Sequence, residues 1–139
     1  MGIVKDQRGF TLVETLVVIM IIGILAAVAF AVFGSQRNKA HDAEAKSAAT
    51  LVTSALLIYQ QEHETFATAD EAALIAIEPA IGNIPDFTID AGADRFELSV
   101  TSRSGEAGGG PFSVVYEAGE AARSCAAPSR GGCPDGGVW

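Results

Sequence analysis

The stretch QRGFTLVETLVVIMIIGILAAVAFAVF, residues 7–33, holds a single carboxylate, Glu14, at the start of a long apolar run. No charged residue follows it until Arg37. At about 1.5 Å of rise per residue, a helix over this run is long enough to cross the hydrocarbon core of a bilayer. A charge at the edge of such a segment is costly unless it has a partner. The position of Glu14 therefore predicts a partner for it.

Two basic residues, Lys5 and Arg8, precede the apolar run. The positive-inside rule then places the N-terminus in the cytoplasm and the rest of the chain outside. A secretory signal has a shorter apolar core followed by a small-residue cleavage site. Since this run is too long and lacks such a site, it predicts a single-pass anchor in the cytoplasmic membrane with the C-terminal head outside.

Composition argues against several classes of function. The 139 residues carry a formal charge of −8 with only nine Lys and Arg, which disfavours direct nucleic-acid binding. His41 and His63 are isolated on a helix, and the glycine-rich loop GEAGGGP lacks the lysine of a phosphate loop. The aspartates at 86, 90 and 94 are better explained as a solvated loop than as a calcium site. We therefore predict no enzyme activity, no cofactor and no metal.

Two cysteines, Cys125 and Cys133, lie close together near the C-terminus. They are either free thiols of a cytosolic protein or a disulfide that closes a loop of about nine residues, worth about 2.5 kcal/mol on the loop-entropy model. Export of the head to an oxidising compartment favours the disulfide.

The segment from Phe10 to about Glu62 contains no proline, which predicts one long helix with two weak points at Gly23 and Gly34. Its second half is amphipathic, with an apolar face at three- and four-residue steps: Ala48, Leu51, Val52, Ala55, Ile58 and Tyr59. Asp42 and Lys46, four residues apart, predict a solvated turn at the start of that half.

After this helix, Thr68 and Glu71 form a capping-box pattern that predicts a short helix ending before Pro79. Strand patterns follow in DFTID, RFELSVTS and PFSVVYEA, with a last strand around residues 122–126. The predicted fold class is α+β, with the long N-terminal helix packed on a small C-terminal antiparallel sheet. Trp139 either packs back on this head or is exposed.

The order of residues from Gly9 to Glu14 resembles the processing site of type IV pilins and pseudopilins. A short basic leader ends in glycine, Phe10 follows, and a glutamate stands four residues later ahead of an apolar helix. The resemblance covers about residues 1–60 and is architectural beyond them. It implies cleavage between Gly9 and Phe10 by a prepilin peptidase and N-methylation of Phe10.

The same resemblance suggests the partner of Glu14. Cleavage creates an amine on Phe10, which pairs with Glu14 either within one helix or, as the family implies, between neighbouring subunits, where it sets their register. A third reading leaves Glu14 solvated at the headgroup boundary. Gly23 stands where many pilins loosen the helix, although Ala31 occupies the place of the proline that commonly follows. Close helix packing in a membrane explains Gly23 and Gly34 equally well.

The predicted organisation is a leader over residues 1–9, a transmembrane and filament-core helix over 10–36, and a pilin head over 37–139. The predicted function is that of a structural subunit of a type IV pilus, used for adhesion, motility or DNA uptake. Its expected partners are further copies of itself in a helical filament, the prepilin peptidase, and an assembly platform with its ATPase. The chain would move from the cytoplasmic membrane to an extracellular filament. The alternatives are a pseudopilin of a type II secretion or DNA-uptake system and an uncleaved membrane-anchored binding domain.

Overall fold

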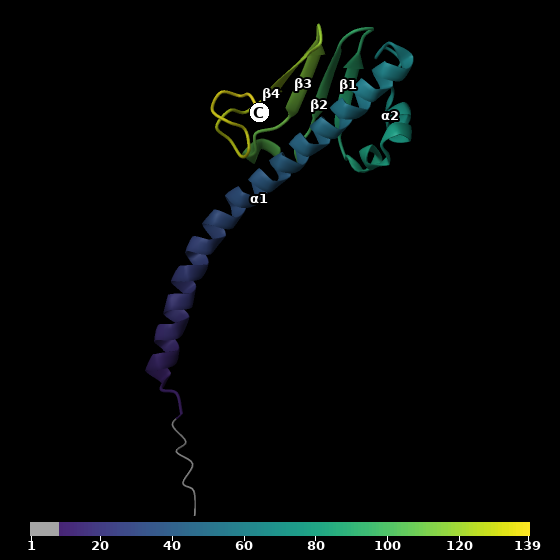
Figure 1. Ribbon diagram of the computed structural model, residues 1–139. Coiled ribbons are helices and arrows are strands. Elements are labelled where there is room, and N and C mark those ends of the chain that lie inside the picture. The colour runs from purple at the N-terminus through teal and green to yellow at the C-terminus, as the bar shows by residue number, and fades with distance from the viewer. Residues whose placement is uncertain (1–8) are drawn as a thin grey trace, which may run out of the picture. The chain divides into compact units, whose positions relative to one another are not determined.

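The computed structural model describes residues 9–139, so the predicted leader lies outside the described residues except for Gly9. The chain divides into two compact units, the first ending at Gly34 and the second running from Ser35 to Trp139. Helix α1, Leu12–His63, contributes to both units, and a four-stranded sheet belongs to the second (Figure 1). The chain is thus α+β, as the sequence predicts.

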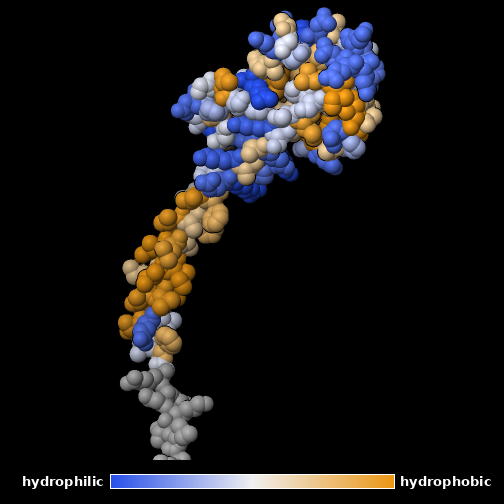
Figure 2. All heavy atoms as spheres, in the orientation of Figure 1, coloured by the Kyte–Doolittle hydropathy of each residue, from blue (hydrophilic) through white to orange (hydrophobic). Residues whose placement is uncertain are grey.

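In the first unit, α1 exposes its apolar residues on every side. Leu12, Ile19, Leu25 and Phe33 each keep more than half of their surface exposed. Hydrophobic residues cover the visible face of this segment, whereas hydrophilic residues dominate the visible face of the second unit (Figure 2). Among the described helices, α1 is long and apolar enough to cross a membrane, by length and composition.

The sheet of the second unit is a simple antiparallel meander in the order β1-β2-β3-β4. Its strands are β1, Phe87–Ala91; β2, Phe96–Val100; β3, Phe112–Glu117; and β4, Glu120–Cys125. Consecutive strands pair antiparallel, so the chain reverses direction at each turn. The turns β1–β2 and β3–β4 therefore lie at the same end of the sheet. The long β2–β3 connection lies at the other end.

The core forms between the second half of α1 and one face of the sheet. Val52 and Leu56 of α1 are fully buried, as are Leu98 of β2 and Val114 of β3. The predicted apolar face of α1 is confirmed except at Ile58, which is 44% exposed. The buried face of α1 also includes Ala45, Ala49 and Leu56, which the prediction did not name.

Helix α2, Glu71–Ile77, ends before Pro79 as predicted, but its start differs from the prediction. The N-cap is Asp70, whose side chain accepts a hydrogen bond from the Ala73 amide at 2.8 Å. Thr68 instead contacts the Tyr59 hydroxyl at 2.9 Å. Asp70 is the N-cap because an aspartate one residue before the helix reaches the free amides of the first turn directly. Short 3-10 segments, Pro79–Asn83 and Gly105–Ala107, complete the second unit.

Candidate functional site

The start of α1 is closed by a reciprocal pair of hydrogen bonds between Thr11 and Glu14. The Thr11 hydroxyl accepts from the Glu14 amide at 3.2 Å, and the Glu14 carboxylate accepts from the Thr11 amide at 2.9 Å. The Thr11 hydroxyl also donates to the same carboxylate at 2.8 Å. This is a capping box, which satisfies amides that a helix N-terminus leaves unpaired.

The capping box gives Glu14 a partner that the sequence analysis missed. Its hydrogen bonds within the described residues go to Thr11, one turn back, although the TxxE spacing of a capping box was present in the sequence. Phe10, just before the cap, is 86% exposed. Among residues 9–139, no hydrogen bond or ion pair joins Phe10 to Glu14, so their pairing stays a prediction.

Gly23 and Gly34 both lie inside the continuous helix α1. A Cβ atom built at either glycine would meet nothing within 4 Å in this subunit. Neither glycine is therefore required by close packing within the subunit, and their predicted roles in helix flexibility stay predictions.

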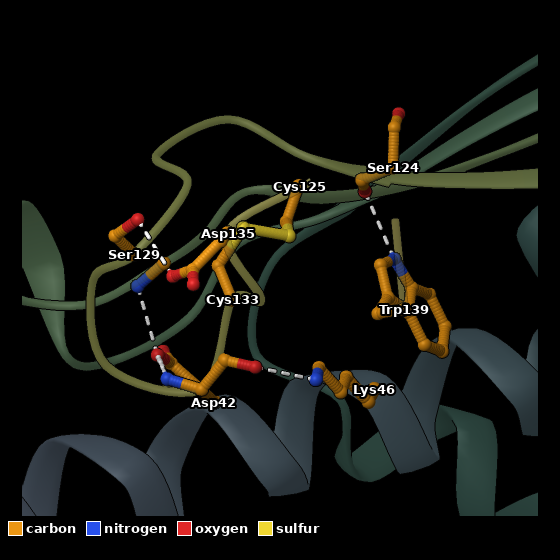
Figure 3. The surroundings of a disulfide bond; sticks show 10 residues. Asp42, Lys46, Ser124, Cys125, Ser129, Cys133, Asp135 and Trp139 are labelled. Atoms are coloured by element: carbon orange, nitrogen blue, oxygen red, sulfur yellow. Dashed lines mark hydrogen bonds between the residues drawn. A yellow bond between two sulfur atoms is a disulfide. The ribbon is translucent and has the colours of Figure 1, made fainter. Parts of the chain in front are cut away.

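At the other end of the chain, Cys125 and Cys133 form the predicted disulfide, with their Cα atoms 5.9 Å apart. The bond links the end of β4 to the C-terminal loop (Figure 3). The Cys125 amide also donates to the Gly137 carbonyl at 2.8 Å, which returns the last residues to the edge of β4.

A buried carboxylate fixes this loop to α1. Asp42 is fully buried and accepts four hydrogen bonds from two loops, at 2.6–2.8 Å. We call this group the Asp42 clamp; its donors are the Ser102 and Ser104 hydroxyls and the Gly109 and Gly132 amides. The prediction that Asp42 marks a solvated turn is wrong, because these donors replace the water that it would lose on burial.

The clamp holds Asp42 ionised. Burial acts to raise the pKa of Asp42, but the hydrogen bonds from Gly132, Ser102, Ser104 and Gly109 outweigh it and hold that pKa below its usual value. Glycines at two loop positions allow the backbone to lie this close to Asp42 and to Cys133. A Cβ on Gly131, whose φ is +51°, would lie 2.1 Å from Asp42 Oδ2, and one on Gly109 would lie 2.3 Å from Cys133 Cβ.

Lys46, one helical turn after Asp42, completes the attachment. Its Nζ donates to the Gly132 carbonyl at 2.6 Å, so two side chains of α1 bind both polar groups of one loop residue (Figure 3). Lys46 Nζ also lies 5.3 Å from the centre of the Phe112 ring and 5.9 Å from that of Trp139. Asp42 and Lys46 thus both form hydrogen bonds with Gly132 rather than with each other.

Trp139 packs back on the head, which resolves the alternatives left by the sequence. Its indole Nε1 donates to the Ser124 carbonyl at 2.9 Å, and its ring meets Phe112 edge-on with centroids 5.9 Å apart. Arg123 lies over the same ring. The C-terminus therefore covers part of the edge of β4.

The clamp was absent from the sequence analysis, although a signal for it existed. Two glycine-rich loops, SGEAGGG and SRGGC, carry small residues and hydroxyls at closely spaced positions. Such loops let backbone amides approach a carboxylate, but nothing in the sequence says which carboxylate. No group of three or more His, Cys, Asp or Glu within residues 9–139 is placed to hold a metal ion.

Comparison with known proteins adds one match. A family model described as the prokaryotic N-terminal methylation motif matches residues 4–30. The matched segment includes Gly9, Phe10, the capping box and most of the apolar run. Neither the curated proteins nor the solved structures include a match to this chain.

Proposed function

We propose that this chain is a member of the type IV pilin and pseudopilin superfamily and the precursor of a type IV pilin that polymerises into a surface filament. Proteins of this superfamily are structural subunits rather than enzymes. The methylation motif implies processing by a prepilin peptidase and assembly into a filament.

The observation that carries the proposal is the surface of α1 in the first unit. Its large apolar residues, from Leu12 to Phe33, are about half exposed or more, on all sides of the helix. Such a surface is stable in lipid or against other copies of the same helix, and not in water. A subunit that leaves the membrane must therefore exchange lipid for neighbouring helices, which is what a filament core supplies.

In this proposal, cleavage after Gly9 creates the amine of Phe10, which is then methylated. The amine pairs with Glu14 of a neighbouring subunit, because two opposite charges entering an apolar filament core are far less costly together than apart. Pairing at one position along otherwise featureless apolar helices also sets their register. The capping box supplies Glu14 with donors before such a neighbour is present.

The proposed assignments extend to the other predicted regions. Residues 1–9 are the leader, residues 10–36 the membrane and filament-core helix, and residues 37–139 the head. Gly23 and Gly34 let the helix adjust in the filament. The subunit waits in the cytoplasmic membrane with its head outside, and an assembly platform with its ATPase moves it into the extracellular filament.

A surface pilin is favoured over a pseudopilin by the way the C-terminal loop is held. A disulfide and the Asp42 clamp order this loop with protein groups, whereas major pseudopilins often use bound calcium there. A covalently closed head suits a filament that leaves the cell. The pseudopilin of a type II secretion or DNA-uptake system remains the second candidate because it shares the methylation motif.

The test is mass spectrometry of the N-terminus of protein sheared from the cell surface, with electron microscopy of the same fraction. We expect filaments built from chains that start at N-methylated Phe10. Processed chains confined to the membrane, without surface filaments, would support the pseudopilin. An intact Met1 chain in a host with an active prepilin peptidase would instead indicate an uncleaved anchored domain.

A further inference from the structure

Strand β1 forms one edge of the sheet and β4 the other (Figure 1). Two hydrogen bonds just beyond the ends of β1 show which of its main-chain groups face away from the sheet. The Gly92 amide donates to the Arg95 carbonyl at 2.8 Å, and the Thr101 amide donates to the Asp86 carbonyl at 3.1 Å. Because bonded and non-bonded pairs alternate along an antiparallel ladder, the even-numbered residues of β1 bond to β2.

The odd-numbered residues of β1 therefore direct their amides and carbonyls outward, at the edge of the sheet. These residues are Phe87, Ile89 and Ala91. Within residues 9–139, no hydrogen bond reaches these outward groups. At the edge of β4, by contrast, the outward Cys125 amide donates to the Gly137 carbonyl. A row of unpaired amides and carbonyls at strand spacing is complementary to another extended main chain.

A pocket of about 300 Å³ lies beside the edge of β1. Phe87 and Ile89 line it, and both are only half-buried. Their cross-strand partners, Val100 and Leu98, belong to the core, so the pocket continues the core face of the sheet. Side chains of an added strand would alternate between the two faces of the sheet. Those on the core face would enter this pocket and complete the burial of its apolar residues.

The remaining residues that line the pocket determine the charge of its occupant. They are Ala69, Asp70 and Glu71, at the start of α2. Both carboxylates are exposed, and neither forms an ion pair within the described part of the chain. A long basic side chain suits such a pocket, because its apolar stem packs on Phe87 and Ile89 while its charge reaches the carboxylates.

We propose that the edge of β1 binds an extended segment of a partner polypeptide, which adds a strand to the sheet and places a lysine or arginine side chain in the pocket. Hydrogen bonds to the main chain of Phe87, Ile89 and Ala91 supply the affinity, and the pocket supplies the selection. Strand β1 of a second copy is a poorer occupant, because it contains no basic residue. The inference does not depend on the proposed filament function, since the surface belongs to a single head.

The test is NMR of the full-length chain in detergent micelles, with a blocked peptide of sequence Thr-Val-Thr-Arg-Thr-Val-Thr as the probe. The control peptide has glutamate in place of arginine. We expect the arginine peptide to slow amide exchange at Ile89 and Ala91, whose amides face outward. Exchange at Thr88 and Asp90 should stay slow throughout, because their amides are already bonded to β2. The glutamate peptide should bind at least about tenfold more weakly.

Three results would overturn this inference. One is unchanged exchange at Ile89 and Ala91 with the arginine peptide at about 1 mM, a concentration that detects even weak binding. Equal binding of the two peptides would exclude a basic occupant. Protection of the same amides that appears without peptide and grows with protein concentration would assign the edge to a second copy instead.

Substitutions separate the edge from the fold of the head. Ala91→Pro removes an amide that is unpaired in the subunit, so the head should unfold at the temperature of the wild type. Binding of the arginine peptide should still fall at least about tenfold, because the proline ring occupies the edge. E71K leaves the main chain of β1 unchanged and should reverse the preference between the two peptides. Thr88→Ala, on the other face of the sheet, is the matched control and should change nothing; normal binding by both Ala91→Pro and E71K would overturn the inference.

Discussion

The two halves of helix α1 are built from similar apolar residues but meet very different surroundings. In the first unit, Ile19 and Phe33 are mostly exposed, and in the second unit, Val52 and Leu56 are fully buried against the sheet. The second half obtains its apolar contacts within the chain, whereas the first must obtain them from lipid or from other subunits. The apolar residues that hold the head together are therefore different from those whose exposed surface needs a partner outside the chain.

The polar groups of α1 follow the same division. Among residues 9–139, the Glu14 carboxylate is bound by Thr11, one turn away in the first unit. Asp42, in the second unit, accepts hydrogen bonds from four donors in residues 60 to 90 positions away in the chain. Variants at Glu14 should therefore affect assembly and spare the head. Variants at Asp42 should affect the head first.

The largest effect is expected from Glu14→Leu. Processing and the fold of the head should be intact, since the hydrogen bonds of Glu14 within residues 9–139 go to Thr11, but surface filaments should fall at least about tenfold because the register-setting charge is gone. Filaments sheared from equal numbers of cells are quantified by immunoblot. The matched control is Glu62→Leu, an exposed glutamate on the same helix; normal filament yield from the Glu14 variant would remove the proposed charge pair.

Asp42→Ala should destabilise the head strongly, by about 3 kcal/mol, because it leaves several buried donors without an acceptor. Urea unfolding of the full chain in mild detergent, followed by the fluorescence of Trp139, measures the change. Asp86→Ala, at an exposed aspartate, should stay within about 0.5 kcal/mol of the wild type. An equally small effect at Asp42 would mean that the clamp is not important for stability.

The clamp also predicts a pH dependence. Since the folded state lowers the pKa of Asp42, its contribution is present above the unfolded value of about 3.9 and is lost as the pH falls through the lower folded value. The difference in unfolding free energy between the wild type and Asp42→Asn should therefore be constant from pH 7 to 5 and shrink below about pH 4. A difference that grows on acidification would contradict the assigned direction.

Removing the disulfide should have a slightly smaller effect than removing the clamp. The double variant Cys125→Ser/Cys133→Ser should lose about 2.5 kcal/mol, as expected for a loop of about nine residues. Limited trypsin digestion should then cut after Arg130, which lies within the loop, while the oxidised wild type resists. Equal resistance of both proteins would indicate that the clamp alone orders the loop.

The smallest effect is expected from Thr11→Val, which removes the hydroxyl of the capping box. A lost N-cap costs a helix about 1 kcal/mol, so the first turn of α1 should fray without loss of the rest. Amide exchange at Glu14, measured by NMR in micelles, should increase, whereas Thr11→Ser should match the wild type. Unchanged exchange in the valine variant would show that Glu14 does not depend on Thr11.

Much of the fold follows from local patterns in the sequence. Alternating residues in RFELSVTS and PFSVVYEA identify β2 and β3, and the absence of proline identifies α1, because strand and helix periods are properties of neighbouring residues. The capping box was also local, and its pattern was present in TLVE. The start of α2 was misassigned because two capping patterns overlapped and Asp70 lay closer to the helix.

The long apolar segment, the methylation motif, the α+β class and the close spacing of the two cysteines could all be predicted without the structure, since each depends on composition or on residues near one another in the chain. The environment of Asp42 and the packing of Trp139 became visible only in the folded head. Asp42 depends on hydroxyls and amides brought from distant loops. A pattern along the chain cannot specify which donors reach a carboxylate, because that is set by how α1 and the sheet pack.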